Sequence, residues 1–187
     1  MLERIDGKYL LVLGFHGAKV ADPAAALKTL RESFPTVEIQ LLRSDRVAGE
    51  EHLSFSARNA LRAFSQHYER SRTLAMEVLV FASCQRQISR AIATLGLTAG
   101  TRGVALVAFS SSQAAFNGLA EAIQRLTGGV LDAEVLSIGT HRKLEQLKRV
   151  YRIGTFELDV SRTQDESDKE AVKRLVIERS ALLALEG

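Results

Sequence analysis

The chain has 187 residues, of which 46% are hydrophobic and 25% are charged, and this composition is typical of one folded globular domain. Its formal charge of +3 and its pI near 9.2 permit an anionic partner without requiring one, because a concentrated basic patch is what marks a nucleic-acid site. A single cysteine excludes an internal disulfide, and with no signal peptide or apolar run near the ~20 residues that span a bilayer we expect a cytoplasmic protein without membrane contact.

Hydrophobic periodicity and capping residues predict the elements of the first half of the chain. Asp22 is a good helix cap, and Pro23 suits the first helical position, where its missing N–H is not needed. Residues 37–42 alternate apolar and polar side chains, as a strand with one buried face does. The expected elements are, in order, a strand at 8–13 ended by Gly14 and Gly17, a helix that starts at Pro23 and is ended by Phe34 and Pro35, a half-buried strand at 37–42, a polar loop at 43–50, and an amphipathic helix at 50–69.

Residues 74–82 are apolar almost throughout, so periodicity does not separate a helix from a strand there. We favour a helix because Leu74, Val78 and Phe81 share one helical face, although the two valines of the run favour a strand. The next expected elements are a helix at 88–95 stopped by Gly96 and a buried strand at 104–109. A helix capped by Ser111 or Ser112 should follow and end at Gly128 and Gly129, with these residues buried: Phe116, Leu119, Ile123 and Leu126. The last expected elements are a helix capped by Thr140 and, after a polar, acidic stretch at 157–170, a C-terminal helix.

The order of these elements predicts an α+β fold, because strands and helices do not alternate regularly as they do in a doubly wound sheet. We expect a mixed β-sheet with several helices packed against it, in a single compact domain covering residues 1–187. No internal repeat, Gly/Ser linker or low-complexity tract marks a domain boundary, and residues 157–168 are expected to form a surface loop.

The sequence lacks the familiar motifs of enzyme active sites. It contains no phosphate-binding loop, dinucleotide fingerprint, zinc-protease motif or nucleophile elbow, and its four histidines show no paired spacing for a metal. Cys84 lies near Arg86, but a nucleophilic thiol also needs a placed base and oxyanion donors. We therefore expect no catalytic residue, no metal, no cofactor and no small-molecule substrate, in a protein that is not an enzyme.

Residues 76–97 form the most distinctive stretch of the chain: an apolar run, a polar turn that reads Ser-Cys-Gln-Arg-Gln, and a short amphipathic segment closed by a glycine. The residues that carry a family pattern there are Glu77, Ser83, Arg86, Gln87, Ile88, Ala91, Ile92 and Gly96. The pattern resembles the accessory KEOPS-complex subunit that binds the PRPK-type kinase, the TPRKB family. Cys84 stands where that family more often has glycine, which alone enters left-handed backbone space without cost.

The resemblance implies a function that composition and periodicity do not. The KEOPS complex makes threonylcarbamoyladenosine next to the anticodon of tRNAs that read codons beginning with adenosine. A separate subunit transfers the threonylcarbamoyl group, and a small atypical kinase serves as its ATPase partner. The subunit resembled here binds that kinase and holds the tRNA, notably its single-stranded 3′ CCA end. The implied partners are therefore the PRPK-type kinase and tRNA, and the implied role is recruitment rather than catalysis.

The helix expected at 88–95 is the candidate kinase interface. Its apolar side chains recur at helical spacing, and in the family this helix contributes to the face that docks on the kinase. The expected interface residues are Ile88, Ile92 and Leu95. The same stripe would also suit a helix that simply packs on the protein's own core.

The candidate tRNA contacts come from several segments. Residues 45–52 resemble the family's pattern of aspartate, valine, a small residue and histidine, and a histidine ring or an arginine suits an unpaired RNA end. The expected tRNA-binding residues are Arg43, Arg46, His52, Arg58, Arg62 and Arg86. A solvated helix face explains several of them equally well. A basic run at 141–152 either tracks the tRNA body or balances the acidic stretch beyond it.

Two other classes of function stay open on the sequence alone. One is a stand-alone RNA-binding or regulatory α+β module that needs no kinase. The other is a small enzyme that uses Cys84 or His52 on a scaffold whose motif is not recognised.

Overall fold

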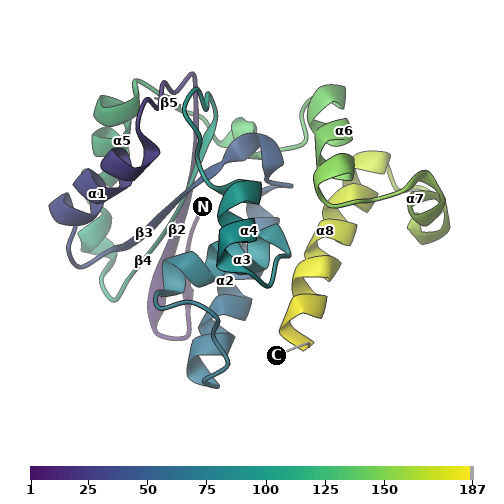
Figure 1. Cartoon of the computed structure of the whole chain (residues 1–187), viewed down its shortest axis with the longest axis horizontal. Helices are drawn as coiled ribbons and strands as arrows, with labels where there is room; N and C mark the ends of the chain where they lie inside the picture. Colours follow the sequence, from purple (N-terminus) through teal and green to yellow (C-terminus); the bar gives the residue numbers. More distant parts are fainter. Residues whose placement is uncertain (186–187) are drawn as a thin grey trace.

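An antiparallel sheet forms the frame of the protein (Figure 1). The computed structural model describes residues 1–185. Strands β1, β2, β4 and β3 lie side by side in that order, and β5 pairs with the end of β2. The α+β prediction is confirmed, but each pairing in the described sheet is antiparallel, so the sheet is not mixed. The strands are β1 (Leu2–Ile5), β2 (Lys8–His16), β3 (Glu38–Arg43), β4 (Val104–Ser110) and β5 (Val130–Leu131).

Helices cover both faces of this sheet (Figure 1). Helices α1 and α5 pack on one face, α2 and α3 pack on the other, and α6, α7 and α8 form a further layer with its own apolar cluster. The described helices are α1 (Pro23–Ser33), α2 (Glu50–Ser65), α3 (Leu74–Ser83), α4 (Ile88–Leu95), α5 (Leu119–Thr127), α6 (His141–Val150), α7 (Thr155–Ser161) and α8 (Asp168–Leu185), with 3₁₀ turns η1 (Ser44–Arg46), η2 (Gln113–Phe116) and η3 (Ala133–Leu136). None of the described helices is both long and apolar enough to cross a membrane.

The strand predicted at 37–42 is present, but the prediction that one of its faces is exposed was wrong because helices cover both faces of the sheet. The inner residues of β3 are all buried, including Gln40 at 4% exposure, so the alternation of apolar and polar residues does not mark a solvated face. The same double coverage buries every residue of β4. The Gln40 side-chain nitrogen donates to Leu41 O at 3.1 Å, whereas its buried Oε1 accepts no hydrogen bond from the described residues.

The helix prediction at 74–82 is confirmed, and the caps predicted at Asp22 and Thr140 form, whereas Ser112 makes no side-chain cap. Helix α3 is buried on nearly all sides, which is why its sequence shows no polar face. The Asp22 carboxylate accepts hydrogen bonds from the N–H groups of Ala24 and Ala25 at the start of α1. The Thr140 hydroxyl accepts one from Lys143 N at the start of α6.

The first strand region differs from the prediction. Strand β2 continues through Gly14 to His16, and a Cβ at Gly14 would lie 2.6 Å from Asp132 O, so this glycine permits a close approach of the chain before η3 rather than a stop. Strand β1 was not predicted because it has only four residues, of which Glu3 and Arg4 are charged. It forms a hairpin with β2 through Asp6 and Gly7, whose φ angles of 46° and 81° suit a tight type I′ turn.

Three helix boundaries also differ. Helix α2 ends at Ser65 rather than at residue 69. The helix expected after Ser112 splits into η2 and α5, because Gly118 adopts φ 79° and breaks the chain direction, and Leu126 is 40% exposed rather than buried. The expected surface loop at 157–168 begins inside α7, so the loop proper spans only residues 162–167.

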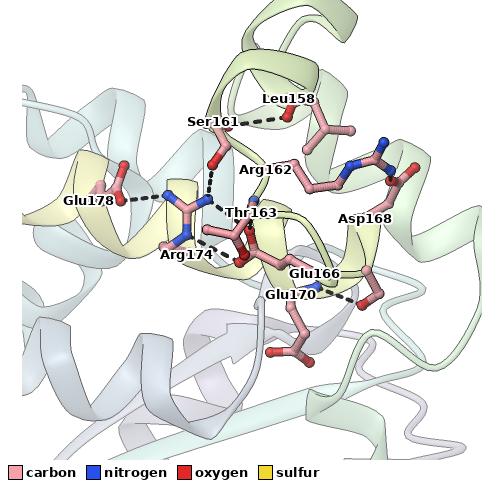
Figure 2. A network of polar contacts seen from close by, with 10 residues as sticks. Leu158, Ser161, Arg162, Thr163, Glu166, Asp168, Glu170, Arg174 and Glu178 are labelled. Atoms are coloured by element: carbon pink, nitrogen blue, oxygen red, sulfur yellow. Dashed lines mark hydrogen bonds and ion pairs between the residues drawn. The ribbon is translucent and has the colours of Figure 1, made fainter.

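That short loop is held by a polar network centred on Arg174 of α8 (Figure 2). The Arg174 guanidinium donates to the Glu166 carboxylate, to Glu178 and to the backbone carbonyl of Ser161 at the end of α7. A second ion pair joins Arg162 and Asp168 across the loop at 2.8 Å. The acidic stretch is therefore paired with cations of α8 and of the loop itself.

Candidate functional site

The turn between α3 and α4 is built on a left-handed residue. Cys84 ends α3 with φ 54° and ψ 33°, and Gln85 N donates to Val80 O at 3.3 Å across the helix end. This is the conformation that favours glycine, which explains the family preference at this position. The turn sends the chain back so that α4 begins at Ile88, with Gln87 as its first flanking residue.

Helix α4 exposes only part of its apolar stripe. Ile92 is 45% exposed, whereas Ile88 is half-buried and packs against the core. Leu95 has no exposed surface, so its assignment to a partner interface was wrong: it faces the core with Ala91. Gly96 stops the helix as expected, although its φ of −61° is not left-handed. Glycine suits this position for lack of space, because a Cβ there would lie 2.5 Å from Ile92 O.

A hollow lies on the other flank of α4. It has a volume of about 320 Å³ and is lined by the α3–α4 turn, by Arg90 of α4 and by Leu183 near the end of α8. Ile92 is two residues from Arg90, which places the two side chains about 200° apart around the helix. Beside Leu183, the side chains of Leu182 and Leu185 are 56% and 81% exposed. The hollow therefore borders both α4 and the end of α8, whereas Ile92 lies on the opposite side of α4.

His52 is not at the surface. Its ring has no exposed area, its Nδ1 accepts a hydrogen bond from Ala48 N at 3.2 Å, and its Nε2 lies 3.0 Å from Ala82 O. The donor at Ala48 requires the proton to sit on Nε2, which then donates to Ala82 O. Burial lowers the pKa of His52 to about 4. The expected stacking of His52 on an RNA base is therefore wrong, because no base can reach the ring.

The predicted arginines do not converge on one site. Arg43 donates to both oxygens of Asp45, at 3.1 and 2.8 Å. Arg46 donates to Thr94 O at 2.6 Å and so caps the end of α4. Arg58, on α2, pairs with Glu3 at 2.8 Å. Arg62 and Arg86 are both exposed, on α2 and in the α3–α4 turn respectively.

A basic groove, defined here as the surface bordered by Arg43, Arg102 and Arg142, lies at the end of the sheet near η1 and α6. It consists of two adjoining hollows of about 410 and 270 Å³ that share Asp45, Arg102, Gly103 and Arg142. In the described part of the chain Arg102 and Arg142 are exposed and make no ion pair, whereas Asp45 is engaged by Arg43. The groove therefore carries unneutralised positive charge, although Glu134 also borders its larger hollow.

Hydroxyl groups line the smaller hollow. Thr101 Oγ1 donates to Thr98 O at 2.8 Å and accepts from Thr98 N at 3.0 Å, which makes the loop before β4 a fixed turn. Sequence reasoning missed Arg102 because it is a single basic residue in this loop. Only the fold brings it to Arg142, which lies 40 positions later in the chain.

Neighbouring charges in the groove are tuned by burial and pairing. Burial raises the pKa of Asp45, but hydrogen bonds from Arg43 and Gln146 outweigh burial and hold that pKa below its usual value. Burial lowers the pKa of Lys143 to about 8, and its ammonium group donates to Val135 O and Leu136 O at 2.8 Å. Lys143 and Arg142 both line the larger hollow, but the Lys143 ammonium group is bound to backbone carbonyls whereas Arg142 is exposed.

Cys84 is poorly suited to catalysis. Burial raises the pKa of its thiol to about 12, so the thiolate is scarce near neutral pH. The thiol contacts Val176 O at 3.8 Å, and no base accompanies it in the described residues around it. The part of the chain that the structure describes also contains no group of three or more side chains able to hold a metal ion.

A family model described as kinase binding protein CGI-121 matches residues 18–184 of the chain. The chain belongs to the CGI-121 family. This membership confirms the resemblance to the TPRKB family that residues 76–97 carried. The CGI-121 family consists of kinase-binding proteins, so a kinase is the class of partner that membership supports. No curated protein matches the chain significantly.

Proposed function

We propose that this chain is the non-catalytic subunit of a cytoplasmic KEOPS-type complex, which binds the small PRPK-type kinase and brings tRNA to it for threonylcarbamoyladenosine synthesis. The observation that carries the proposal is the CGI-121 match across residues 18–184. The raised pKa of the partly buried Cys84 thiol supports a non-catalytic role. The exposed side chains of α4 and the basic groove supply one candidate surface for each partner.

The kinase docks, in this proposal, on α4, the α3–α4 turn and the end of α8. A stable interface buries about 800 Å² on each partner, and an eight-residue helix about 12 Å long cannot supply that area alone. The hollow lined by Arg90 and Leu183 joins α4 to α8 and extends the surface. Ile92 supplies an exposed apolar anchor on α4, and Leu182 and Leu185 are exposed on the last turn of α8.

An Ile92→Glu variant tests this docking surface. Because Ile92 is 45% exposed, glutamate can project into solvent without unfolding the chain, and we expect the kinase affinity to fall at least about tenfold with an unchanged melting temperature. Val130→Glu is the matched control, since Val130 is 52% exposed on β5, away from α4. A folded Ile92→Glu protein that binds the kinase as tightly as the wild type would remove α4 from the interface.

The basic groove is the proposed site for the single-stranded 3′ end of tRNA. Arg102 and Arg142 can neutralise phosphates, and the hydroxyl groups of Thr98 and Thr101 lie in the same hollow. The two hollows adjoin, so they suit an extended strand rather than a single ion. Arg62 and Arg86 lie outside the groove, and we propose for them contacts with the tRNA body.

Salt-dependent binding tests this site. A doubly substituted protein, Arg102→Gln with Arg142→Gln, should bind tRNA more weakly. The negative slope of log affinity against log salt should become shallower by about 1.4, since each phosphate contact to a single strand contributes ~0.7 to its magnitude. Arg125→Gln on α5, another exposed arginine, should leave the slope unchanged. Trimming the CCA end should weaken wild-type binding but have little effect on the double variant. Equal wild-type affinity for intact and trimmed tRNA would contradict recognition of the end.

A further inference from the structure

A buried carboxyl group orders the segment that precedes α3. Glu77 lies in the first turn of α3 and has no exposed surface. Its Oε2 accepts hydrogen bonds from the backbone N–H groups of Arg70 and Ser71, at 3.0 and 2.8 Å. Burying a carboxylate is unfavourable unless strong partners compensate. Glu77 therefore holds the backbone of residues 70–71 against α3.

The Arg70 side chain extends from that segment to the end of α8. Its Nη2 donates to Leu183 O at 3.2 Å, and its guanidinium lies over the Phe81 ring, 5.9 Å from the centroid. Its Nη1 faces Glu77 Oε1 at 4.0 Å, and its side chain is only 17% exposed. The charges of Arg70 and Glu77 thus face each other, while their closest contacts are with backbone groups. Together the two residues connect α3 to the last turn of α8.

That last turn depends on outside partners. The final carbonyl groups of a helix have no N–H donor within the helix, and a cation placed there satisfies one of them and interacts favourably with the helix dipole. Leu183 is buried at 4% exposure and lines the hollow beside α4, whereas Leu182 and Leu185 in the same turn project outward. The direction of these two exposed leucines is therefore set by how firmly the last turn is held.

We propose that Glu77 and Arg70 are positioning residues for the kinase. Neither needs to touch the partner: Glu77 fixes Arg70, Arg70 fixes the end of α8, and the end of α8 presents Leu182 and Leu185 beside the α3–α4 turn. A turn that is already ordered costs less entropy when a partner binds it. This inference rests on the proposed docking of the kinase on α4 and α8.

Two conservative variants test the inference on the full chain with its kinase. Glu77→Gln keeps an oxygen for the N–H groups of Arg70 and Ser71 but removes the charge that faces the guanidinium. Arg70→Lys keeps a cation beside Glu77 but lacks the planar fork that reaches Leu183 O. For each we expect kinase affinity to fall roughly fivefold to tenfold, with faster hydrogen exchange confined to the last turn of α8. Arg72→Gln, an exposed neighbour, is the control and should change neither.

The double variant and the α4 variant sharpen the test. If the two residues act through one path, the double variant Glu77→Gln with Arg70→Lys should have the same kinase affinity as whichever single variant has the lower affinity. A fall in melting temperature with wild-type kinase affinity would show a merely structural role and overturn the inference. The proposed docking on α4 is tested separately by Ile92→Glu. If Ile92→Glu loses kinase binding while Glu77→Gln and Arg70→Lys bind the kinase normally, only the positioning role is overturned.

Discussion

At the scale of single residues, His52 is an uncharged imidazole in the packing between α2, α3 and α6. Ala82 O accepts from His52 Nε2 at 3.0 Å, and the Tyr151 hydroxyl lies 2.9 Å from the same oxygen. The two rings meet edge to face, 5.8 Å apart. His52 therefore joins the helical layer next to the sheet to the layer that contains α6.

This environment predicts a pH-dependent stability. The pKa of His52 is about 4 in the folded chain and about 6.5 when unfolded, so the unfolded chain binds the proton first. The contribution of His52 is complete above about pH 6.5 and is lost as the pH falls through about 4, for a total of about 3 kcal/mol. Urea unfolding of the wild type and of His52→Gln across that range measures it. Identical pH slopes in both proteins would contradict the assignment.

Cys84 shows that one left-handed residue can carry a side chain where glycine is preferred. Its φ of 54° is accessible to a residue with a Cβ only at a cost of about 1 kcal/mol. His67 and Arg152 adopt similar angles, at 59° and 54°, after α2 and α6. These helix ends carried no glycine signal and so were harder to place from the sequence.

Replacing Cys84 by glycine and by alanine separates strain from packing. Both changes remove the thiol, but only Cys84→Gly relieves the left-handed strain. We expect Cys84→Gly to be more stable than Cys84→Ala by about 1 kcal/mol, measured as the difference in free energy of unfolding in urea. Equal stabilities would mean that the turn relaxes out of the left-handed region when the thiol is removed.

At the scale of elements, ion pairs add to the packing of one buried leucine in holding α7 to α8. Leu158 is the buried residue of α7, whereas Phe156 and Val160 are 81% and 71% exposed. Arg179 pairs with Glu157 at 3.0 Å, and Arg174 joins the end of α7 to the loop and to Glu178 (Figure 2). Ion pairs at the surface are weak singly, so this element depends on several acting together.

Arg174→Gln should therefore loosen the loop at 162–167 without unfolding the chain. We expect a loss of about 1 kcal/mol at most, because Arg174 is 36% exposed and solvent screens its pairs. Limited proteolysis should cut the loop faster in Arg174→Gln than in Arg162→Gln, since Arg162 has a single ion pair, with Asp168. Equal cleavage rates would show that the Arg174 network does not order the loop.

At the scale of the whole molecule, two surfaces suit two different partners. Helix α4 and the end of α8 offer exposed isoleucine and leucine side chains, and the basic groove offers Arg102 and Arg142. A protein that holds a kinase on one surface and tRNA on another raises the local concentration of tRNA at the kinase without chemistry of its own. The proposed function depends on both surfaces being accessible at once.

Reconstitution tests that dependence. The isolated chain should show no turnover, and adding it to the kinase and transferase subunits at limiting tRNA should increase tRNA-dependent ATP hydrolysis and tRNA modification. Arg102→Gln with Arg142→Gln should reduce the increase and leave tRNA-independent hydrolysis unchanged. If the reaction ran equally fast without this chain at limiting tRNA, the recruiting role would be wrong.

Much of the fold was predictable because its signals are local. Caps such as Asp22 and Thr140 act within one turn, and the periodic side chains of α2 and α4 mark their helices directly. Strand β1 was missed because it is only four residues long and two of them are charged, so it shows no hydrophobic periodicity. The half-buried reading of β3 failed because the second helical layer on that sheet comes from distant parts of the chain.

The candidate site was less predictable than the fold. Ile92 and Leu95 belong to one stripe in the sequence, yet one is 45% exposed and the other has no exposed surface. His52 and Arg46 looked like RNA ligands by residue type, but one is buried and the other caps α4. Arg102 had no signal at all, because its charge matters only beside Arg142.

The sequence by itself determined the family, the α+β class and the absence of recognisable catalytic motifs, since these depend on short motifs and on periodicity within single elements. Only the tertiary structure decided which side chains are accessible. Burial is set by what packs against an element: His52 and Leu95 are covered by other elements, and Glu77 by the segment that precedes its own helix. Residues with the same local pattern therefore end in the core or at the surface according to contacts between segments far apart in the chain.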